Sequence, residues 1–155
     1  MAEKKVYVAS PSGFSELGRM HYEEDILAPL RRLGFTVLDP WSSVAKESPQ
    51  ELIRQSRDTS SSDALRIGVR NAQLIREADF FLAILDGPDV DAGVAAELGF
   101  AVGVGKRVVG YRGDFRPSGD FLALPVNAQL AAFIELGHGR ILTSMEDLWK
   151  ALEEA

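Results

Sequence analysis

Two carboxylates lie close together in the sequence, beside a run of small and apolar residues. Glu97 is surrounded by alanine, leucine and glycine in residues 95–99, and Asp91 precedes it by six positions. A carboxylate among such neighbours is costly to bury without a partner or a task, because desolvation disfavours its charged form. Six positions correspond to about 240° of helical rotation, so the two side chains converge only if Asp91 belongs to the preceding loop. With that placement, they form a candidate catalytic pair.

Other common catalytic and metal-binding chemistries lack the residues they need. The sequence contains no cysteine, which excludes disulfides, thiolate zinc sites and cysteine nucleophiles. His21 and His138 are the only histidines, too few for a histidine-rich metal site and little material for a Ser-His-Asp triad. Carboxylates, hydroxyls and amides remain, and we expect neither a metal nor an organic cofactor.

The glycine-containing segment 99–106 does not match a phosphate-binding loop. Arg107 stands where a P-loop has serine or threonine, and the segment leads from an expected helix into an expected strand, which reverses the P-loop order. The glycines at 103 and 105 lack the third glycine of a dinucleotide fingerprint. Neither type of nucleotide site is therefore expected here.

Composition and charge indicate one soluble domain with a small substrate. The chain has 155 residues and 46% hydrophobic content, enough for one core, and we expect a single domain over residues 1–155. The formal charge of −6 and the lack of a long basic run argue against DNA, RNA or an anionic membrane as a partner. There is no signal-peptide pattern and no apolar stretch near the ~20 residues that span a bilayer, so we expect a cytoplasmic protein.

Short apolar runs alternate with helical patterns along the chain. Strands are predicted at residues 6–9, 35–38, 80–85, 107–111 and 141–142. Helices are predicted at residues 14–33, 64–75, 90–104, 121–136 and 144–153, whereas residues 42–50 fit no element. This alternation predicts an α/β fold: a doubly wound, flavodoxin-like, five-stranded parallel sheet with helices on both faces.

Individual residues mark the expected ends of these helices. Gly34 is placed to end the first helix, and Pro29 to kink it. The serines and aspartate at 60–63 are expected to cap the second helix, and Ser144 with Asp147 the last one. The helix predicted at 121–136 is unusually apolar, which favours a subunit contact over an ordinary core position.

Ligands of such sheets bind beyond the carboxyl ends of the strands. The loops that follow the first four predicted strands gather polar and aromatic side chains at that edge: Ser10, Phe14, Asp39, Trp41, Asp86, Asp91 and Arg112.

Several segments together carry a family resemblance. They are residues 6–11, 38–41, 78–80, 91–101, 111–116 and 126–129. The spacing from Asp91 to Glu97, with Asn127 downstream, is their most specific part. On these segments the chain resembles the nucleoside 2-deoxyribosyltransferase family, whose relatives include N-glycosidases that act on nucleoside monophosphates.

The resemblance implies a covalent mechanism. Glu97 would attack the anomeric carbon of a 2′-deoxyribose to give a glycosyl-enzyme, which a second nucleobase intercepts with retention of configuration. Asp91 would assist proton transfer to the leaving base, and Tyr7 would hold Glu97 through its hydroxyl. Asn127 would reach across a subunit interface to the 5′-hydroxyl of the sugar. The implied partners are a nucleoside or nucleotide, a nucleobase and a second copy of the chain in a homodimer or larger oligomer.

The implied substrate-binding residues surround this pair. Phe14 and Trp41 would be walls that stack on the base, and Asn71 stands where several members of the family have an acidic residue facing the base. The full implied set is Ser10, Phe14, Asp39, Trp41, Asn71, Gly93 and Asn127.

Each role has a structural alternative. Glu97 would instead pair with Lys106 or Arg107 at the surface, and Asp91 would only cap its helix. Tyr7 would be an ordinary core aromatic, and Asn127 would be a turn or cap residue.

Three functions remain open on this sequence. The first is a 2-deoxyribosyltransferase, and the second is a hydrolase that splits a nucleoside 5′-monophosphate with the same glutamate. In the hydrolase, Ser10, Ser12 and Arg19 would hold the phosphate near a helix N-terminus. The third is a nucleotide-binding sensor without turnover.

Overall fold

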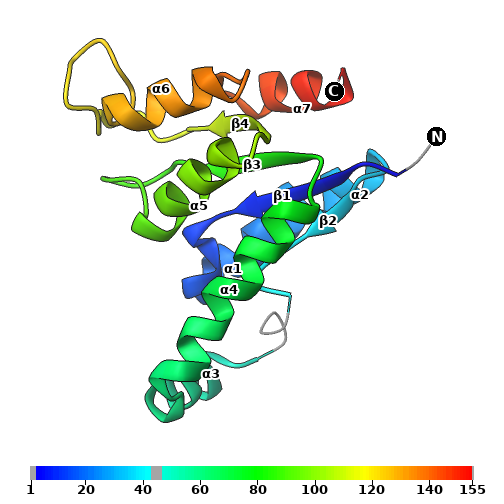
Figure 1. The fold of residues 1–155 in the computed structure, drawn as a ribbon, viewed down its shortest axis with the longest axis vertical. Coiled ribbons are helices and arrows are strands. Elements are labelled where there is room, and N and C mark those ends of the chain that lie inside the picture. Colours follow the sequence, from blue (N-terminus) through cyan, green and yellow to red (C-terminus); the bar gives the residue numbers. More distant parts are fainter. Residues whose placement is uncertain (1–2, 43–46, 155) are drawn as a thin grey trace.

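The strands form one parallel sheet. A computed structural model describes residues 3–42 and 47–154. Its sheet has five strands in the order β2-β1-β3-β4-β5, the flavodoxin order, and every pairing is parallel (Figure 1). The predicted fold class is therefore confirmed. The strands are β1 (Lys5–Ala9), β2 (Thr36–Leu38), β3 (Phe80–Ile84), β4 (Arg107–Tyr111) and β5 (Ile141–Leu142).

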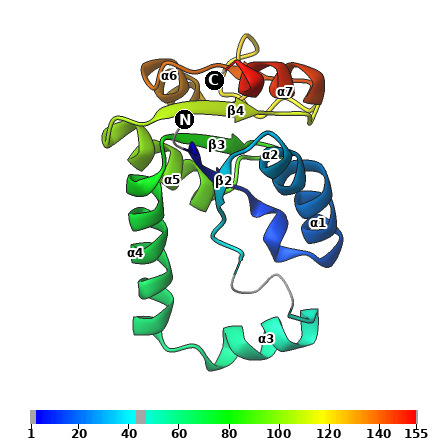
Figure 2. The same cartoon turned by 90° about the vertical axis from the view of Figure 1, so that its right-hand side faces the viewer.

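Helices cover both faces of the sheet, and alternation along the strands divides the core in two. Val6 and Val8 of β1 pack in one cluster, with residues of the N-terminal helices and of α7 (Met145–Glu153). Tyr7 and Ala9 pack in the other, with residues of α4 (Ser61–Glu77), α5 (Ala92–Gly103) and α6 (Ala128–Leu136). Figure 2 shows the two layers on either side of the strands. Successive side chains of a strand point to opposite faces, so two layers of helices bury both.

The first predicted helix is divided into several segments. A 3₁₀ turn (Pro11–Phe14) leads into α1 (Glu16–His21), a π-helical segment (Tyr22–Leu27) and α2 (Ala28–Arg32). The π-helical segment ends at Leu27, two residues before Pro29, which has no N–H to donate; the Ala28 N–H between them bonds to the Glu23 carbonyl, five residues back. Gly34 follows α2 with φ +86°, the conformation that ends a helix.

The apolar face expected for this helix is only partly buried. Ile26 and Leu30 lie in the core, whereas Phe14, Leu17 and Leu33 are exposed. Phe14 belongs to the 3₁₀ turn, and the change of helix type rotates the following side chains away from a single 3.6-residue stripe.

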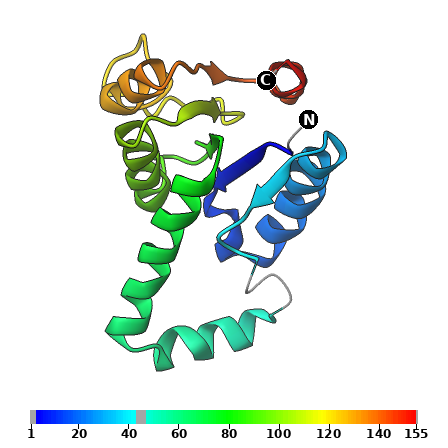
Figure 3. The same cartoon turned by 45° about the vertical axis from the view of Figure 1, so that its right-hand side comes forward.

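An arm of two helices extends from the sheet. Helix α3 (Pro49–Asp58) begins after the N-cap Ser48, inside a segment for which no element was predicted; residues 43–46 lie outside the described ranges. Ser60 caps α4 by accepting the Asp63 N–H, as predicted. Figures 1 and 3 show α3 at the far end of α4, away from the strands. Consequently Leu65 and Val69, predicted as apolar helix positions, are exposed.

The apolar helix predicted at 121–136 is shorter than expected. Its described form, α6, begins at Ala128, because Asn127 is its N-cap and Pro125 precedes the cap. Phe121 and Leu122 lie in the loop before it and are exposed.

Within residues 3–42 and 47–154, no helix is both long enough and apolar enough to cross a bilayer.

Candidate active site

A hollow of about 320 Å³ lies at the carboxyl edge of the sheet, between the loop after β1 and helices α4 and α5. Most of the predicted site residues line it: Ser10, Phe14, Trp41, Asn71, Asp91, Gly93 and Glu97. Pro40, Ile67 and Val94 also line it, and none of these three is among the predicted site residues.

Glu97 lies in the middle turn of α5 and contacts α4 through its carboxylate. The Asn71 side-chain amide donates to Glu97 Oε1 at 3.0 Å. Burial raises the pKa of Glu97 above its ordinary value, the Tyr7 hydroxyl and the Asn71 amide lower it, and the negative charge of Asp91 raises it. Among the described residues, no cation lies within ion-pair distance of Glu97. Lys106 instead donates to the Arg76 and Ala78 carbonyls.

The Tyr7 side chain places a neutral hydroxyl near Glu97. The side chain is fully buried, and its ring stacks on Phe81 with centroids 5.4 Å apart. Burial and the charge of Glu97 raise the pKa of Tyr7 far above its usual value, so the phenol stays protonated. Its oxygen has no partner in hydrogen-bonding geometry among the described residues. The hydroxyl lies close enough to Glu97 to lower the pKa of its carboxyl, and it is available to donate to it.

Asp91 belongs to the loop before α5, the placement that convergence with Glu97 requires. Its Oδ1 accepts the Val94 N–H at 3.0 Å as the N-cap of α5, and the residue also lines the hollow. Gly93 permits this arrangement, because a Cβ at that position would lie 3.0 Å from Asp91 Oδ1. Asp91 therefore caps α5 and lines the Glu97 hollow at the same time.

Trp41 forms a fixed aromatic wall. Its indole N–H donates to the Ser10 carbonyl at 2.9 Å, and its ring meets Phe14 edge to face at 4.7 Å. A Cβ at Gly13 would lie 1.9 Å from the indole, so the glycine is required for this close approach. A planar base would find a flat, apolar surface here.

Asp39 supports this wall without lining the hollow. It is buried, and its Oδ1 accepts the Trp41 backbone N–H at 2.9 Å and the Tyr22 hydroxyl at 3.0 Å. Burial raises the pKa of Asp39, which the two hydrogen bonds oppose. Its observed contacts are therefore those of a positioning residue.

The residues expected to hold a phosphate are divided between separate hollows. Ser10 accepts the Ser12 N–H and donates to the Ser12 hydroxyl. Ser12 lines a hollow of about 520 Å³ with Asp86, whereas Arg19 lines another, of about 410 Å³. The serines and the arginine do not converge on one point.

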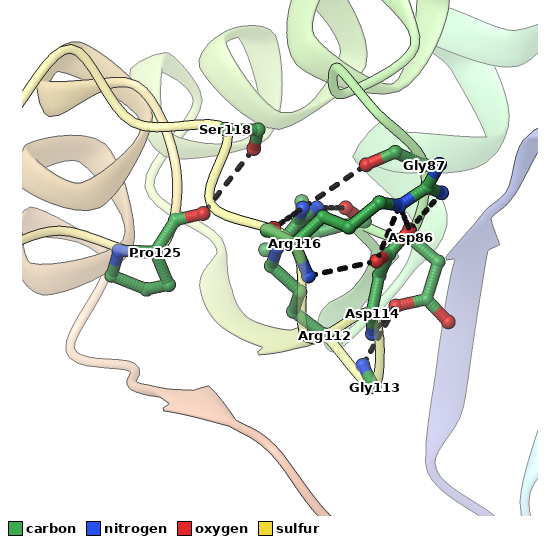
Figure 4. A network of polar contacts seen from close by, with 9 residues as sticks. Asp86, Gly87, Arg112, Gly113, Asp114, Arg116, Ser118 and Pro125 are labelled. Carbon is green, nitrogen blue, oxygen red and sulfur yellow. Dashed lines mark hydrogen bonds and ion pairs between the residues drawn. The ribbon is translucent and has the colours of Figure 1, made fainter. Parts of the chain in front are cut away.

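The loop after β4 draws other predicted edge residues away from the hollow. Arg112 is buried and donates to the carbonyls of Leu85, Gly87 and Arg116 (Figure 4). Asp86 accepts the N–H groups of residues 113 and 114 at 2.6 and 2.8 Å. Both side chains thus hold the loops after β3 and β4 together.

Asn127 has a local structural role in the single chain. Its Oδ1 accepts the Gln129 N–H at 2.9 Å, and its Nδ2 donates to Asp120 at 2.6 Å. It does not line the Glu97 hollow, so any role there would have to come from a second copy of the chain. Within the described part of the chain, no group of three or more histidine, aspartate or glutamate side chains is arranged to hold a metal ion.

Residues 6–129 match the family described as nucleoside 2-deoxyribosyltransferase. The chain belongs to this family. All the residues that line the Glu97 hollow fall within the matched segment. No curated protein matches the chain.

Solved structures of family-like proteins share the fold over nearly the whole chain. A conserved protein from Enterococcus faecalis V583 is 25% identical, with a TM-score of 0.76 and 99% of each chain covered. A 2-deoxyribosyltransferase from Bacillus psychrosaccharolyticus is 24% identical, with a TM-score of 0.67, over 96% of this chain and 95% of that one. A CMP N-glycosidase from Clostridium botulinum is 18% identical, with a TM-score of 0.56, over 98% of this chain and all of that one.

Ile67 is the site residue with the weakest sequence signal. The sequence places it on the apolar face of a long helix. In the structure it lies in α4, one turn before Asn71, and lines the hollow. The i, i+4 spacing of the two residues was the available signal, because it puts both on one face of a helix.

Proposed function

We propose that this member of the family is a nucleoside 2-deoxyribosyltransferase in which Glu97 is the nucleophile. The observation that carries the proposal is the placement of Glu97 in a hollow with an aromatic wall, held by Asn71 and without a cationic partner among the described residues. A carboxylate left without a counter-ion in such a site is suited to attack an electron-poor carbon.

The reaction proceeds in two balanced steps. A Glu97 oxygen forms a bond to the anomeric carbon of the 2′-deoxyribose while the bond from that carbon to the base nitrogen breaks. The electron pair goes to the base nitrogen, and Asp91 relays a proton from solvent to the leaving base. In the second step, another base loses its proton to solvent through Asp91, and its nitrogen displaces the Glu97 oxygen from the anomeric carbon. Two inversions give net retention.

The surrounding residues supply binding and charge control. The base stacks against Trp41 and Phe14, whose rings form the apolar wall. The Tyr7 hydroxyl donates to Glu97 and steadies it between the steps. The reaction requires no metal and no organic cofactor, since the carboxylate bears both the bond and the charge of the oxocarbenium-like transition state.

A homodimer or larger assembly completes the site in this proposal. Asn127 lies beside a loop whose Phe115, Phe121 and Leu122 side chains are exposed. Apolar side chains gathered in one exposed segment support contact with a second copy. Asn127 of that copy then binds the 5′-hydroxyl of the sugar. We place the protein in the cytoplasm.

A 5′-monophosphate N-glycosidase is the second candidate. The hydroxyl pair of Ser10 and Ser12 lies next to the Glu97 hollow, and the fold is shared with the CMP N-glycosidase. In this case water replaces the second base in the second step, with the same glutamate as nucleophile.

Chromatography of product bases tests both candidates. The protein is incubated with a 2′-deoxynucleoside, with and without a second free base, and in parallel with the matching 5′-monophosphate. A new nucleoside that forms only with the second base supports the transferase. Base released from the monophosphate alone supports the hydrolase. If no product forms in any incubation, both enzyme candidates are contradicted and a nucleotide-binding protein is favoured.

A further inference from the structure

A second hollow opens on the other side of the aromatic wall. It has a volume of about 410 Å³ and lies between the N-terminal turn, α3 and α4. Phe14, Trp41 and Ile67 line both this hollow and the one that contains Glu97. These three side chains therefore form a shared partition, and we call the space behind it, away from Glu97, the annex.

The annex has an apolar interior. Leu52 and Ile53 of α3 line it opposite the partition. Ile53 and Ile67 both line the annex and remain 54% and 58% exposed, so much of their apolar surface is open to solvent. Apolar surface of this kind gains free energy when a ligand covers it.

The polar side chains of α3 that line the annex are already engaged. The Ser56 hydroxyl donates to the Ile53 carbonyl at 2.8 Å, and the Thr59 hydroxyl donates to the Gln55 carbonyl at 2.6 Å. Because these donors bond within their own helix, a polar ligand gains little from them. Glu16 and Arg19 bring opposite charges to the annex and so select for neither sign of ligand charge.

One member of the partition can move. Trp41 is held by the Ser10 carbonyl and by the Gly13 backbone against which it packs. Phe14, in contrast, is 76% exposed, and its recorded ring contact is with Trp41. Rotation of an exposed side chain is fast and cheap, so a ligand can pass from one hollow to the other beside Trp41.

Resting on the proposed deoxyribosyl transfer, we infer that the annex binds an apolar substituent on the exocyclic amine of the nucleobase. The sugar must lie at Glu97, which lines the first hollow and not the annex, whereas Phe14, Trp41 and Ile67 line both. A base that stacks on Trp41 with its glycosidic nitrogen toward Glu97 then directs its far edge past the partition toward the annex. In purines that edge carries the amine at C6, and in pyrimidines the amine at C4. The substrates are thus N-alkyl or N-aryl bases and their deoxynucleosides.

Binding of free bases tests this inference without requiring turnover. Calorimetric titration compares adenine with N6-benzyladenine and cytosine with N4-benzylcytosine. We expect the benzyl form of at least one base to bind about tenfold more tightly, because the annex removes the apolar ring from water. Ser56→Trp, which fills the annex from α3, should abolish this gain and leave binding of the unmodified base unchanged.

Matched variants identify the annex as the cause. Arg57→Trp adds the same ring to the neighbouring α3 position, which does not line the annex, and should retain the gain. Ser56→Leu fills less space and should give an intermediate loss. Equal or weaker binding of both benzyl bases, failure of all four bases to bind, or a gain that survives Ser56→Trp would overturn the inference. Absence of base exchange with plain deoxynucleosides would refute the transferase proposal alone, because the binding ratios do not depend on turnover.

Discussion

Asn71 on α4 and Glu97 on α5 are joined by a hydrogen bond of 3.0 Å from the amide nitrogen to the carboxylate. The bond fixes the carboxylate at the wall of the hollow and keeps one of its oxygens turned toward α4. It also favours the ionised form, against the burial that raises the pKa of Glu97. The amide therefore positions the proposed nucleophile.

Replacement of Asn71 should alter the pH profile of activity. In Asn71→Asp a second carboxylate faces Glu97 and raises the pKa of Glu97 further. As the pH is lowered, this variant should therefore lose activity at a higher pH than the parent protein does. Asn71→Ala removes one charge-assisted bond and should lower kcat/KM about tenfold at neutral pH. The measurement is kcat/KM against pH for base exchange. Gln73→Glu, an exposed change on the same helix, should follow the parent profile.

Glu97→Gln should increase stability at neutral pH. Because the folded pKa of Glu97 is raised, the folded chain retains a proton that the unfolded chain has released, and stability falls as pH rises through this window. Above the window the buried charge is a constant cost, which the amide removes. Urea unfolding should show the gain at pH 7 and its disappearance below the ordinary glutamate pKa of about 4.3. A gain of equal size at all pH values would refute this explanation.

Two glycine-to-alanine changes should have opposite signs. Gly13→Ala puts a methyl group into the Trp41 indole and should destabilise the fold and raise KM, because the wall must shift. Gly68→Ala adds a methyl group to an open position within α4 and should stabilise by about 0.5–1 kcal/mol. Thermal unfolding and initial rates of both variants provide the comparison. A neutral Gly13→Ala would mean that Trp41 is not held where we describe it.

Arg112→Met should be among the most destabilising changes outside the hollow. Arg112 is 2% exposed, and its guanidinium donates to the carbonyls of three loop residues, which would be left without this partner. A loss of about 2–4 kcal/mol in the free energy of unfolding is expected. Arg66→Met removes an exposed partner of Asp63 and should cost less than ~1 kcal/mol. Similar losses for the two variants would contradict the network in Figure 4.

Local signals in the sequence predicted much of the fold. Gly34 and Ser60 mark helix ends because each has a backbone role that few other residues can perform. The spacing of Asp91 and Glu97 implied a loop position for the aspartate, and the N-cap geometry agrees with it.

The remaining differences come from tertiary contacts that the sequence does not encode locally. Asp39 and Arg112 carry charges typical of a ligand site, yet each satisfies buried backbone groups of its own chain. Leu65 and Val69 fit the apolar pattern of a helix and yet are exposed, and Phe121 and Leu122, expected in a helix, lie in an exposed loop. Hydrophobic patterning does not distinguish a core face from an exposed one. Helix α3 was missed because Leu52 and Ile53 are the only large apolar residues among its ten positions, too few to mark a helical stripe in the sequence.

Intact-mass spectrometry after acid quenching tests the central claim most directly. The protein is mixed with a 2′-deoxynucleoside without an acceptor base, quenched within one turnover and digested for peptide mapping. We predict an added mass of one deoxyribosyl unit on the peptide that contains Glu97, its absence in Glu97→Ala, and a fall in kcat of about 10³-fold or more in that variant. An adduct on another residue, or base exchange that survives Glu97→Ala, would contradict the assignment of Glu97 as the nucleophile.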